Sequence, residues 1–496
     1  MNSLINTSLP VNSNLPILPQ SVVGHEGVEY ALARNGKDMQ LVLLGNLGDA
    51  RLQVFEGEYR SNDDTTLLLA PLTAINAAAL RAQLPWLQPR LLGLQTSAGM
   101  GDRLGLATPG HIRAVRQTDG AVAPILAQQS MREMTRTGRT PQQVLDDATW
   151  GVFQENWQAG YGADADHLKN PSDVDTCLEA GFTFFTIDPG EHVDNRAEAA
   201  GAGELHELAA KLPTEMCLQA NGLLGQNLKI ERVTIDLNEY TLLKAMVKYG
   251  RAVWHVAMMY EHLKTQSAGR PFELEVSVDE TAQPTSHAEH AYIASELRRL
   301  GVEWVSLAPR FVGEFEKGVD YIGDVAGFEA DIAGHAAVAR HFGGYKLSLH
   351  SGSDKFSIYP AAMRQTRGRV HLKTAGTSYL EALRTVAMLD TQLFSEIYAF
   401  ARSRYETDRV SYHVSAKLER APRPDQVSDW SSLLDQFDAR EILHVTFGSV
   451  LRETTPGGSS VFAERLFHLL RSQPETYARN LEKHFIRHLS PFMQAF

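Results

Sequence analysis

From about residue 90 onward, short strand-like runs alternate with helix-like segments, and this alternation limits the possible folds more than any other feature. It is typical of a parallel sheet, because parallel strands need a crossover connection, usually a helix. Eight such runs favour a closed (β/α)8 barrel over the alternative, a doubly wound open sheet. The runs cover residues 91–95, 123–127, 161–166, 182–187, 272–278, 302–307, 345–349 and 370–373.

The alternation covers only part of the 496 residues, so additions to the barrel are expected. Residues 1–88 mix apolar runs with an Ala/Leu-rich stretch, which predicts a small N-terminal α+β domain. Residues 89–380 are expected to form the barrel, with a largely helical insertion around residues 192–270. Residues 381–496 predict a helical C-terminal extension packed on the barrel.

Charge, hydropathy and cysteine content argue against several classes of protein. A net charge of −12 disfavours nucleic acid and anionic membranes as partners, although a local basic pocket can still bind a small anion. The chain has no run of about 18 apolar residues. No signal-peptide pattern is present, so we expect a cytoplasmic protein. The two cysteines, Cys177 and Cys217, are expected to be buried free thiols. The oligomeric state stays open, with a homo-oligomer as one alternative.

Polar residues follow nearly every predicted strand. Catalytic groups of a (β/α)8 barrel lie at the C-terminal ends of the strands, so we interpret these clusters as parts of one site. Arg103, Gln129, Asp166, His167, Arg310, His350, Lys355, His371 and Lys373 all occupy such positions.

The fifth predicted strand alternates strictly between polar and apolar residues. Glu273, Glu275, Ser277 and Asp279 share one face. Because both faces of a barrel sheet are covered, this polar face must point into the lumen. Buried carboxylates need a metal, a cation or a proton. We therefore predict that at least one of them is functional, with a structural ion pair as the alternative.

Two histidines, His350 and His371, come at the ends of the last two strands, close to the acidic strand. Imidazole and carboxylate donors together can bind Mn²⁺, Zn²⁺, Ni²⁺ or Fe²⁺, so the pair predicts a divalent metal site of unspecified identity. The alternative is that each is a core histidine with satisfied hydrogen bonds.

Three loops could bind an anion or a cofactor. Residues 351–355 and 374–378 follow the last two strands, where backbone N–H groups often hold a carboxylate or phosphate; ordinary Gly/Ser turns are the alternative. Residues 99–105 resemble a dinucleotide-binding loop, but the third glycine comes one residue late, which makes a nicotinamide cofactor the weaker prediction.

Several longer segments resemble the tagaturonate epimerase family. The resemblance covers most of the chain from about residue 90 onward. They are GDRLG (101–105), AQQS (127–130), DDATWGVFQE (146–155), GADADH (162–167), EVSVDET (275–281), LHSGSDKF (349–356) and KTAGTSYL (373–380). Residues 1–88 carry little of this resemblance.

The resemblance implies an isomerase that interconverts D-tagaturonate and D-fructuronate in hexuronate catabolism, with a divalent metal. It implies acid/base roles for Asp166 and Glu275 and metal binding by His167 and His350. Neighbours on a strand face opposite sides, so Asp166 and His167 can both reach the lumen only where the chain leaves the strand. Our geometric reading adds His371 to the metal ligands. It also adds, as candidates to bind the ketohexuronate, Arg103, Gln129, Arg310, Lys355 and Lys373.

The chemistry of such a substrate limits the mechanism. The two sugar acids differ at one hydroxyl-bearing carbon, C4, β to the ketone, so abstraction of an α-proton cannot invert it. Retro-aldol cleavage and re-formation of the bond can, and transient oxidation by a nicotinamide is the second route. Alternatives to an epimerase are a metal-dependent aldolase or lyase acting on a keto sugar acid, a C1/C2 carbonyl isomerase and a sugar-acid binding protein. Activity on neutral ketoses stays open.

Overall fold

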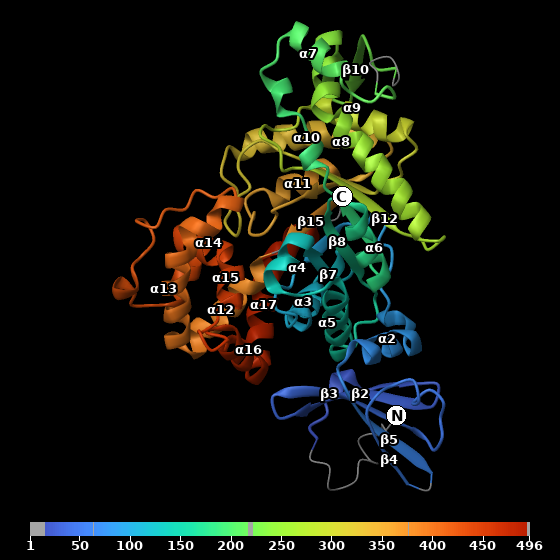
Figure 1. Ribbon diagram of the computed structural model, residues 1–496, viewed down its shortest axis with the longest axis vertical. Helices are drawn as coiled ribbons and strands as arrows, with labels where there is room; N and C mark the ends of the chain where they lie inside the picture. The colour runs from blue at the N-terminus through green and yellow to red at the C-terminus, as the bar shows by residue number, and fades with distance from the viewer. Residues whose placement is uncertain (1–14, 63, 217–221, 375, 494–496) are drawn as a thin grey trace.

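The structure, a computed structural model, describes residues 15–62, 64–216, 222–374 and 376–493. Its centre is a closed barrel of eight parallel strands, which confirms the predicted architecture (Figure 1). The strands are β6 (Ser97–Met100), β7 (Ala123–Ser130), β8 (Gly162–Leu168), β9 (Phe184–Ile187), β12 (Glu273–Val278), β13 (Ser306–Pro309), β14 (Lys346–Leu349) and β15 (Val370–Thr374). Pairing of β15 with β6 closes the barrel and excludes the open sheet.

Helices surround the barrel, and the sequence marks where several of them begin. Thr140, Asn170 and Ser286 each form a capping box that satisfies free N–H groups of the first turn. The helices are α3 (Thr108–Arg116), α4 (Met131–Thr137), α5 (Pro141–Gln154), α6 (Pro171–Ala180), α8 (Glu239–Gln266), α9 (His287–Arg299), α10 (Val325–His341), α11 (Tyr359–Thr366) and α12 (Thr377–Leu389).

The N-terminal part is a small antiparallel sheet beside one end of the barrel (Figure 1). Its strands, in spatial order, are β1 (Val23–His25), β2 (Val28–Asn35), β3 (Asp38–Asn46), β5 (Thr65–Pro71) and β4 (Glu58–Ser61), followed in the chain by α2 (Ala74–Gln83). A buried ion pair of 2.7 Å between Arg81 of α2 and Asp146 of α5 joins this part to the barrel helices.

Two further additions flank the barrel. Residues 192–270, expected to be largely helical, contain α7 (Ala202–Ala209) and α8, and also an antiparallel hairpin of β10 (Gln226–Ile230) and β11 (Val233–Leu237). The C-terminal extension is helical, as predicted. It comprises α13 (Thr391–Asp408), α14 (Phe437–Val445), α15 (Phe447–Arg452), α16 (Ala463–Ser472) and α17 (Pro474–Leu489).

The C-terminal extension packs tightly on the barrel layer through α17 and α3. A Cβ atom at Gly110 of α3 would lie only 2.6 Å from Cβ of Leu481 in α17, so the helices approach closely where the side chain is missing. Within the described ranges, no helix is long and apolar enough to cross a membrane. Cys177 is buried and free, whereas Cys217 lies outside the described residues.

Two strands lie at different positions from those predicted. The first barrel strand is β6, not residues 91–95, where Leu91 and Leu94 are about 40% exposed. β6 consists mostly of small residues, because a Cβ atom at Gly99 would lie 3.1 Å from Cγ of Gln128 inside the lumen. The sixth predicted strand, 302–307, is displaced to β13, which ends at Pro309.

Candidate active site

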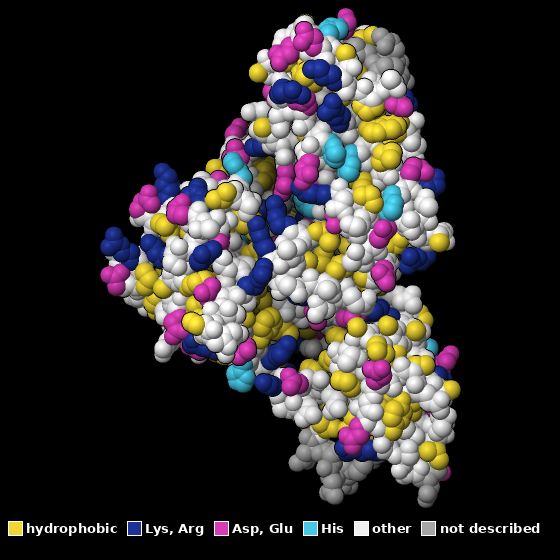
Figure 2. All heavy atoms as spheres, viewed as in Figure 1, with side chains coloured by type: hydrophobic (Ala, Val, Ile, Leu, Met, Phe, Trp, Pro, Cys, Tyr) yellow, Lys and Arg dark blue, Asp and Glu magenta, His cyan; other side chains and the backbone are white. Residues whose placement is uncertain are grey.

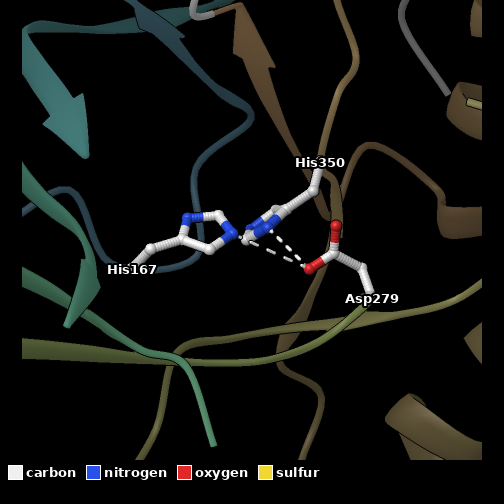
Figure 3. A group of neighbouring side chains, drawn as sticks. All are labelled: His167, Asp279 and His350. Carbon is white, nitrogen blue, oxygen red and sulfur yellow. Dashed lines mark ion pairs between the residues drawn. The ribbon is translucent and has the colours of Figure 1, made fainter. Parts of the chain in front are cut away.

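Two histidines and one carboxylate converge at the C-terminal end of the barrel strands (Figure 3). His167 is on β8, Asp279 directly follows β12, and His350 follows β14. One donor atom from each lies within 4.8 Å of the others. Oδ1 of Asp279 is 3.2 Å from Nδ1 of His350 and 3.9 Å from Nε2 of His167. Two imidazoles and a carboxylate suit a transition-metal cation, so these residues fit the implied metal.

The backbone of β8 explains how Asp166 and His167 both point inward. His167 adopts a left-handed conformation with φ of +56°, and the register between β8 and β9 shifts between Ala165 and Leu168. The strand is therefore interrupted at this point, and the alternation of faces no longer separates the two neighbours. Such strain in a residue other than glycine is typical of functional sites.

Each of the two histidines has a carboxylate on its other ring nitrogen. Oδ1 of Asp166 lies 2.7 Å from Nδ1 of His167, and Oε1 of Glu275 lies 2.7 Å from Nε2 of His350. Carboxylates in this position orient metal-binding histidines and increase their basicity. Asp166 and Glu275, predicted as acid/base residues, thus lie directly behind the candidate metal ligands.

A buried lysine joins the carboxylates. Nζ of Lys373 on β15 lies 2.7 Å from Asp166, 2.9 Å from Glu275 and 2.9 Å from Asp164. It also donates to the hydroxyl of Thr186 at 2.6 Å. We call Lys373, Asp164, Asp166 and Glu275 the carboxylate–lysine cluster.

The cluster shifts the pKa values of Asp166, Glu275 and Lys373 so that their charged forms are favoured. Burial alone would raise the pKa of Asp166 and Glu275, but the neighbouring His167, His350 and Lys373 hold both well below their usual range. Burial likewise disfavours the charged form of Lys373, yet the three carboxylates raise its pKa well above the usual value. Asp164, where burial dominates, has its pKa raised to about 6.

The carboxylates around His350 favour its protonated form. Burial alone would lower its pKa, but the carboxylates of Asp279 and Glu275 raise it to about 10. A metal that binds the imidazole must displace this proton, so acidification is expected to weaken metal binding at this site.

His371, predicted as a third metal ligand, lies too deep in the lumen to join the group. It pairs in register with Ser348, two residues before His350, and its Nδ1 contacts Oγ of Ser97 at 2.9 Å. Burial lowers its pKa to about 3. The structure brings Asp279 to His167 and His350 instead.

A cavity of about 540 Å³ opens above the candidate metal site. A smaller one of about 30 Å³ shares His350, Asp279, Lys317 and Ser351 with it and reaches Asp166 and Lys373. Figure 2 shows the surface hollowed between the C-terminal helices and the barrel, with Lys and Arg side chains along the hollow. The charged and aromatic residues that line the large cavity are Arg132, Asp279, Glu280, Arg310, Phe311, Glu314, Phe315, Lys317, His350, Tyr412 and His413.

Of the residues predicted to bind the substrate, Arg310 lines the large cavity and Lys373 the small one. Arg103 forms a buried ion pair of 2.6 Å with Glu133, and Nζ of Lys355 is surrounded by backbone carbonyl oxygens. Gln129 accepts a hydrogen bond of 3.0 Å from Arg139. The last three residues do not line either cavity.

Arg132 and Lys317 also line the large cavity, although neither is among the residues predicted to bind the substrate. Arg132 is the second residue of α4, right after β7, a position typical of barrel active sites. Lys317 lies in the long loop between β13 and α10, and no local sequence pattern identifies it.

Buried carboxylates, a shared lysine and a histidine pair at the carboxyl ends of parallel strands define an enzyme of the (β/α)8-barrel class. Comparison with known families identifies it further. The model of the tagaturonate epimerase family matches residues 18–492. The chain therefore belongs to the tagaturonate epimerase family, and it is an isomerase of the epimerase type.

Individual relatives agree with this assignment. The tagaturonate/fructuronate epimerase of Thermotoga maritima is 46% identical over 466 residues, which is 94% of each chain. A glycerol complex of the fructuronate-tagaturonate epimerase of Cohnella laeviribosi is 38% identical, with a TM-score of 0.91 over 99% of this chain and 98% of that one. The native structure of that enzyme covers 98% of each chain, also with a TM-score of 0.91. The structural similarity extends over the N-terminal part of the chain, although residues 1–88 carry little of the resemblance in sequence motifs.

Proposed function

We propose that this protein interconverts D-tagaturonate and D-fructuronate by inverting C4, as a metal-dependent step of hexuronate catabolism. The observation that carries the proposal is the cavity itself, in which cationic side chains lie above a His–Asp–His group backed by the carboxylate–lysine cluster. The names of the related epimerases support the choice of substrate.

The cationic side chains of the cavity would hold the carboxylate of the sugar acid. Arg132 lines it from the first turn of α4, and Arg310 and Lys317 line it from the loop between β13 and α10. Arg132 forms an ion pair of 3.3 Å with Glu280, and Arg310 forms one of 3.5 Å with Glu314. Both arginines are partly exposed, so a substrate carboxylate can compete with these glutamates for them. Guanidinium groups suit a planar carboxylate because they can donate two parallel hydrogen bonds.

His167, Asp279 and His350 would hold the divalent cation. Bound there, it would act as a Lewis acid on the ketone of the sugar. The chain's own residues position these ligands, since Asp166 and Glu275 accept hydrogen bonds from the far nitrogens of the two imidazoles.

The carboxylate–lysine cluster would move the protons. Asp166 lines the small cavity and would take the proton of the β-hydroxyl group. The ammonium group of Lys373 contacts both Asp166 and Glu275, so it connects the two carboxylates that would take and return this proton. Cleavage between the α and β carbons, rotation of the aldehyde and re-formation of the bond would then invert C4.

The loop at residues 99–105 favours this retro-aldol route over a redox route. A dinucleotide needs free backbone N–H groups near a helix N-terminus. Here the Asp102 carboxylate accepts from the N–H groups of Leu104, Gly105 and Ala107 at 2.7–3.0 Å. These donors are thus satisfied within the loop.

Metal removal tests the proposal. We expect purified protein to form fructuronate from tagaturonate, to lose this activity on exhaustive chelation, and to regain it when Mn²⁺, Zn²⁺, Ni²⁺ or Fe²⁺ is added back. The metal content before and after chelation, measured by mass spectrometry, identifies the ion. Full activity in metal-free protein would contradict the proposed role of His167, Asp279 and His350.

A further inference from the structure

A second group of histidine and carboxylate side chains lies outside the barrel lumen, between α9 and α10. His287 and His290 belong to α9, and Asp331 and His335 belong to α10. Spacings of three and four residues place each pair on one side of its helix. The reaction proposed above uses none of these residues.

Three donor atoms of this group converge. Oδ1 of Asp331 is 3.4 Å from Nε2 of His287 and 3.6 Å from Nε2 of His335. Zn²⁺ binds imidazole nitrogen and carboxylate oxygen at about 2.0–2.1 Å in tetrahedral geometry, which places neighbouring donors about 3.3 Å apart. The separations of both histidines from Asp331 are therefore close to those of a filled first coordination sphere.

Neighbouring groups orient two of the three side chains. The backbone N–H of Val312 donates to Oδ2 of Asp331 at 3.1 Å, which leaves Oδ1 for the histidines. Nδ1 of His335 is 2.9 Å from Nδ1 of His290, whose Nε2 is 2.7 Å from the hydroxyl of Tyr345. With the proton of His335 on Nδ1, this chain of hydrogen bonds presents the Nε2 lone pair toward Asp331, as in known metal sites.

One ring nitrogen is buried without a hydrogen bond. Nε2 of His335 is buried, and no described residue makes a hydrogen bond of good geometry to it. Unsatisfied buried polar atoms are uncommon in native proteins and are often explained by an ion or a water molecule. Its direction toward Asp331 and His287 makes a cation the natural partner.

The third ligand, His287, reaches the group because α10 has no side chain at Gly334. A Cβ atom there would collide with the imidazole of His287. Nε2 of His287 also lies 3.0 Å from the backbone carbonyl oxygen of Asp331. A cation that binds Nε2 must therefore replace this hydrogen bond. The side chains of His287 and Asp331 are 28% and 14% exposed, which gives the cation a path in and a water molecule access to a fourth position.

We propose that His287, Asp331 and His335 form a second divalent-cation site, selective for ions of the Zn²⁺ class. The cation would fasten α9 to α10, the helices that follow β12 and β13. Through Val312, it would also fix the loop whose residues Phe311 and Gly313 line the large cavity. The role is structural, and it is independent of the reaction proposed for the barrel.

Zinc stoichiometry tests the second site. Protein loaded with Zn²⁺ and dialysed is analysed for zinc per chain, alongside a His287→Gln/His335→Gln double variant and a His341→Gln control on the exposed side of α10. We expect the double variant to bind one zinc fewer than the wild type and the control to bind the same number. Equal zinc content in the wild type and the double variant would overturn the proposal.

A conservative variant guards against misfolding of the double variant. Asp331→Asn keeps the volume and can still accept from the N–H of Val312, but it removes the anionic ligand. In a His167→Asn/His350→Asn background, which disables the barrel site, we expect Zn²⁺ to raise the melting temperature. Adding Asp331→Asn should abolish that rise. No rise in the background protein, or an undiminished rise with Asp331→Asn, would refute the second site.

Discussion

Replacing Glu275 by Gln is expected to leave the protein folded and to reduce turnover by about 10²–10⁴-fold, the usual scale for an acid/base residue. Gln keeps the size of the side chain and can still accept from Nε2 of His350, but it cannot take up a proton. The fold should tolerate the change, because Lys373 keeps Asp164 and Asp166 as partners. Steady-state kinetics with tagaturonate and the unfolding curve of the variant measure the two effects separately.

Glu273→Gln is the matched control for this experiment. Glu273 is on the same strand and face, and it is also buried, but its carboxylate accepts from the backbone N–H groups of Leu92 and Gly93 at the opposite end of the barrel. We expect its turnover to stay close to that of the wild type. Near wild-type turnover in Glu275→Gln would contradict its acid/base role.

Replacing Lys373 by Met is expected to lower the free energy of unfolding at neutral pH by about 3–5 kcal/mol, and to abolish activity, because it leaves buried carboxylates without their cation. Lys346→Met is the matched control. Lys346 is buried in the lumen on the adjacent strand, but its Nζ contacts Oγ of Ser97 at 3.0 Å, and no carboxylate of a described residue lies within 4.0 Å. Burial lowers its pKa to about 8, so its removal should cost much less.

The loss of unfolding free energy in Lys373→Met is expected to depend on pH, and the direction follows from the shifted pKa values. The pKa values of Asp166 and Glu275 are lower in the folded protein than in the unfolded chain, so their ionisation stabilises the fold above the unfolded pKa of about 4. This stabilisation is lost as the pH falls through the folded pKa. In Lys373→Met much of it is already absent, so the gap between variant and wild type should be widest near pH 7 and narrow below about pH 4. Equal destabilisation by both lysine variants, or a gap that does not change with pH, would contradict the role given to Lys373.

The sequence predicts the barrel well because the alternation of strands and helices is periodic. The prediction is wrong where a strand lacks bulky apolar residues, and it does not give the depth of a side chain in the lumen. The polar–apolar alternation predicts β12 and its inward face, and Glu275 and Asp279 both lie near His350, as that alternation requires. The small residues of β6 lack the apolar bulk that marks a strand, so the sequence pattern indicates residues 91–95 instead.

The candidate site shows the same division. The positions of strand ends bring Asp166, His167, Glu275, His350 and Lys373 together in space. Alternation gives the face of a residue but not its depth, so it does not separate His371 from the residues one layer above it. Charge does not reveal a partner, so the sequence does not show that Arg103 pairs with Glu133.

The most direct test of the account is to follow D-tagaturonate by NMR in the presence of purified, metal-loaded protein. We predict that D-fructuronate appears until equilibrium is reached, that the reverse reaction reaches the same ratio, and that no three-carbon products accumulate. Release of three-carbon fragments would show a lyase instead of an epimerase, and the absence of any conversion would contradict the proposed function.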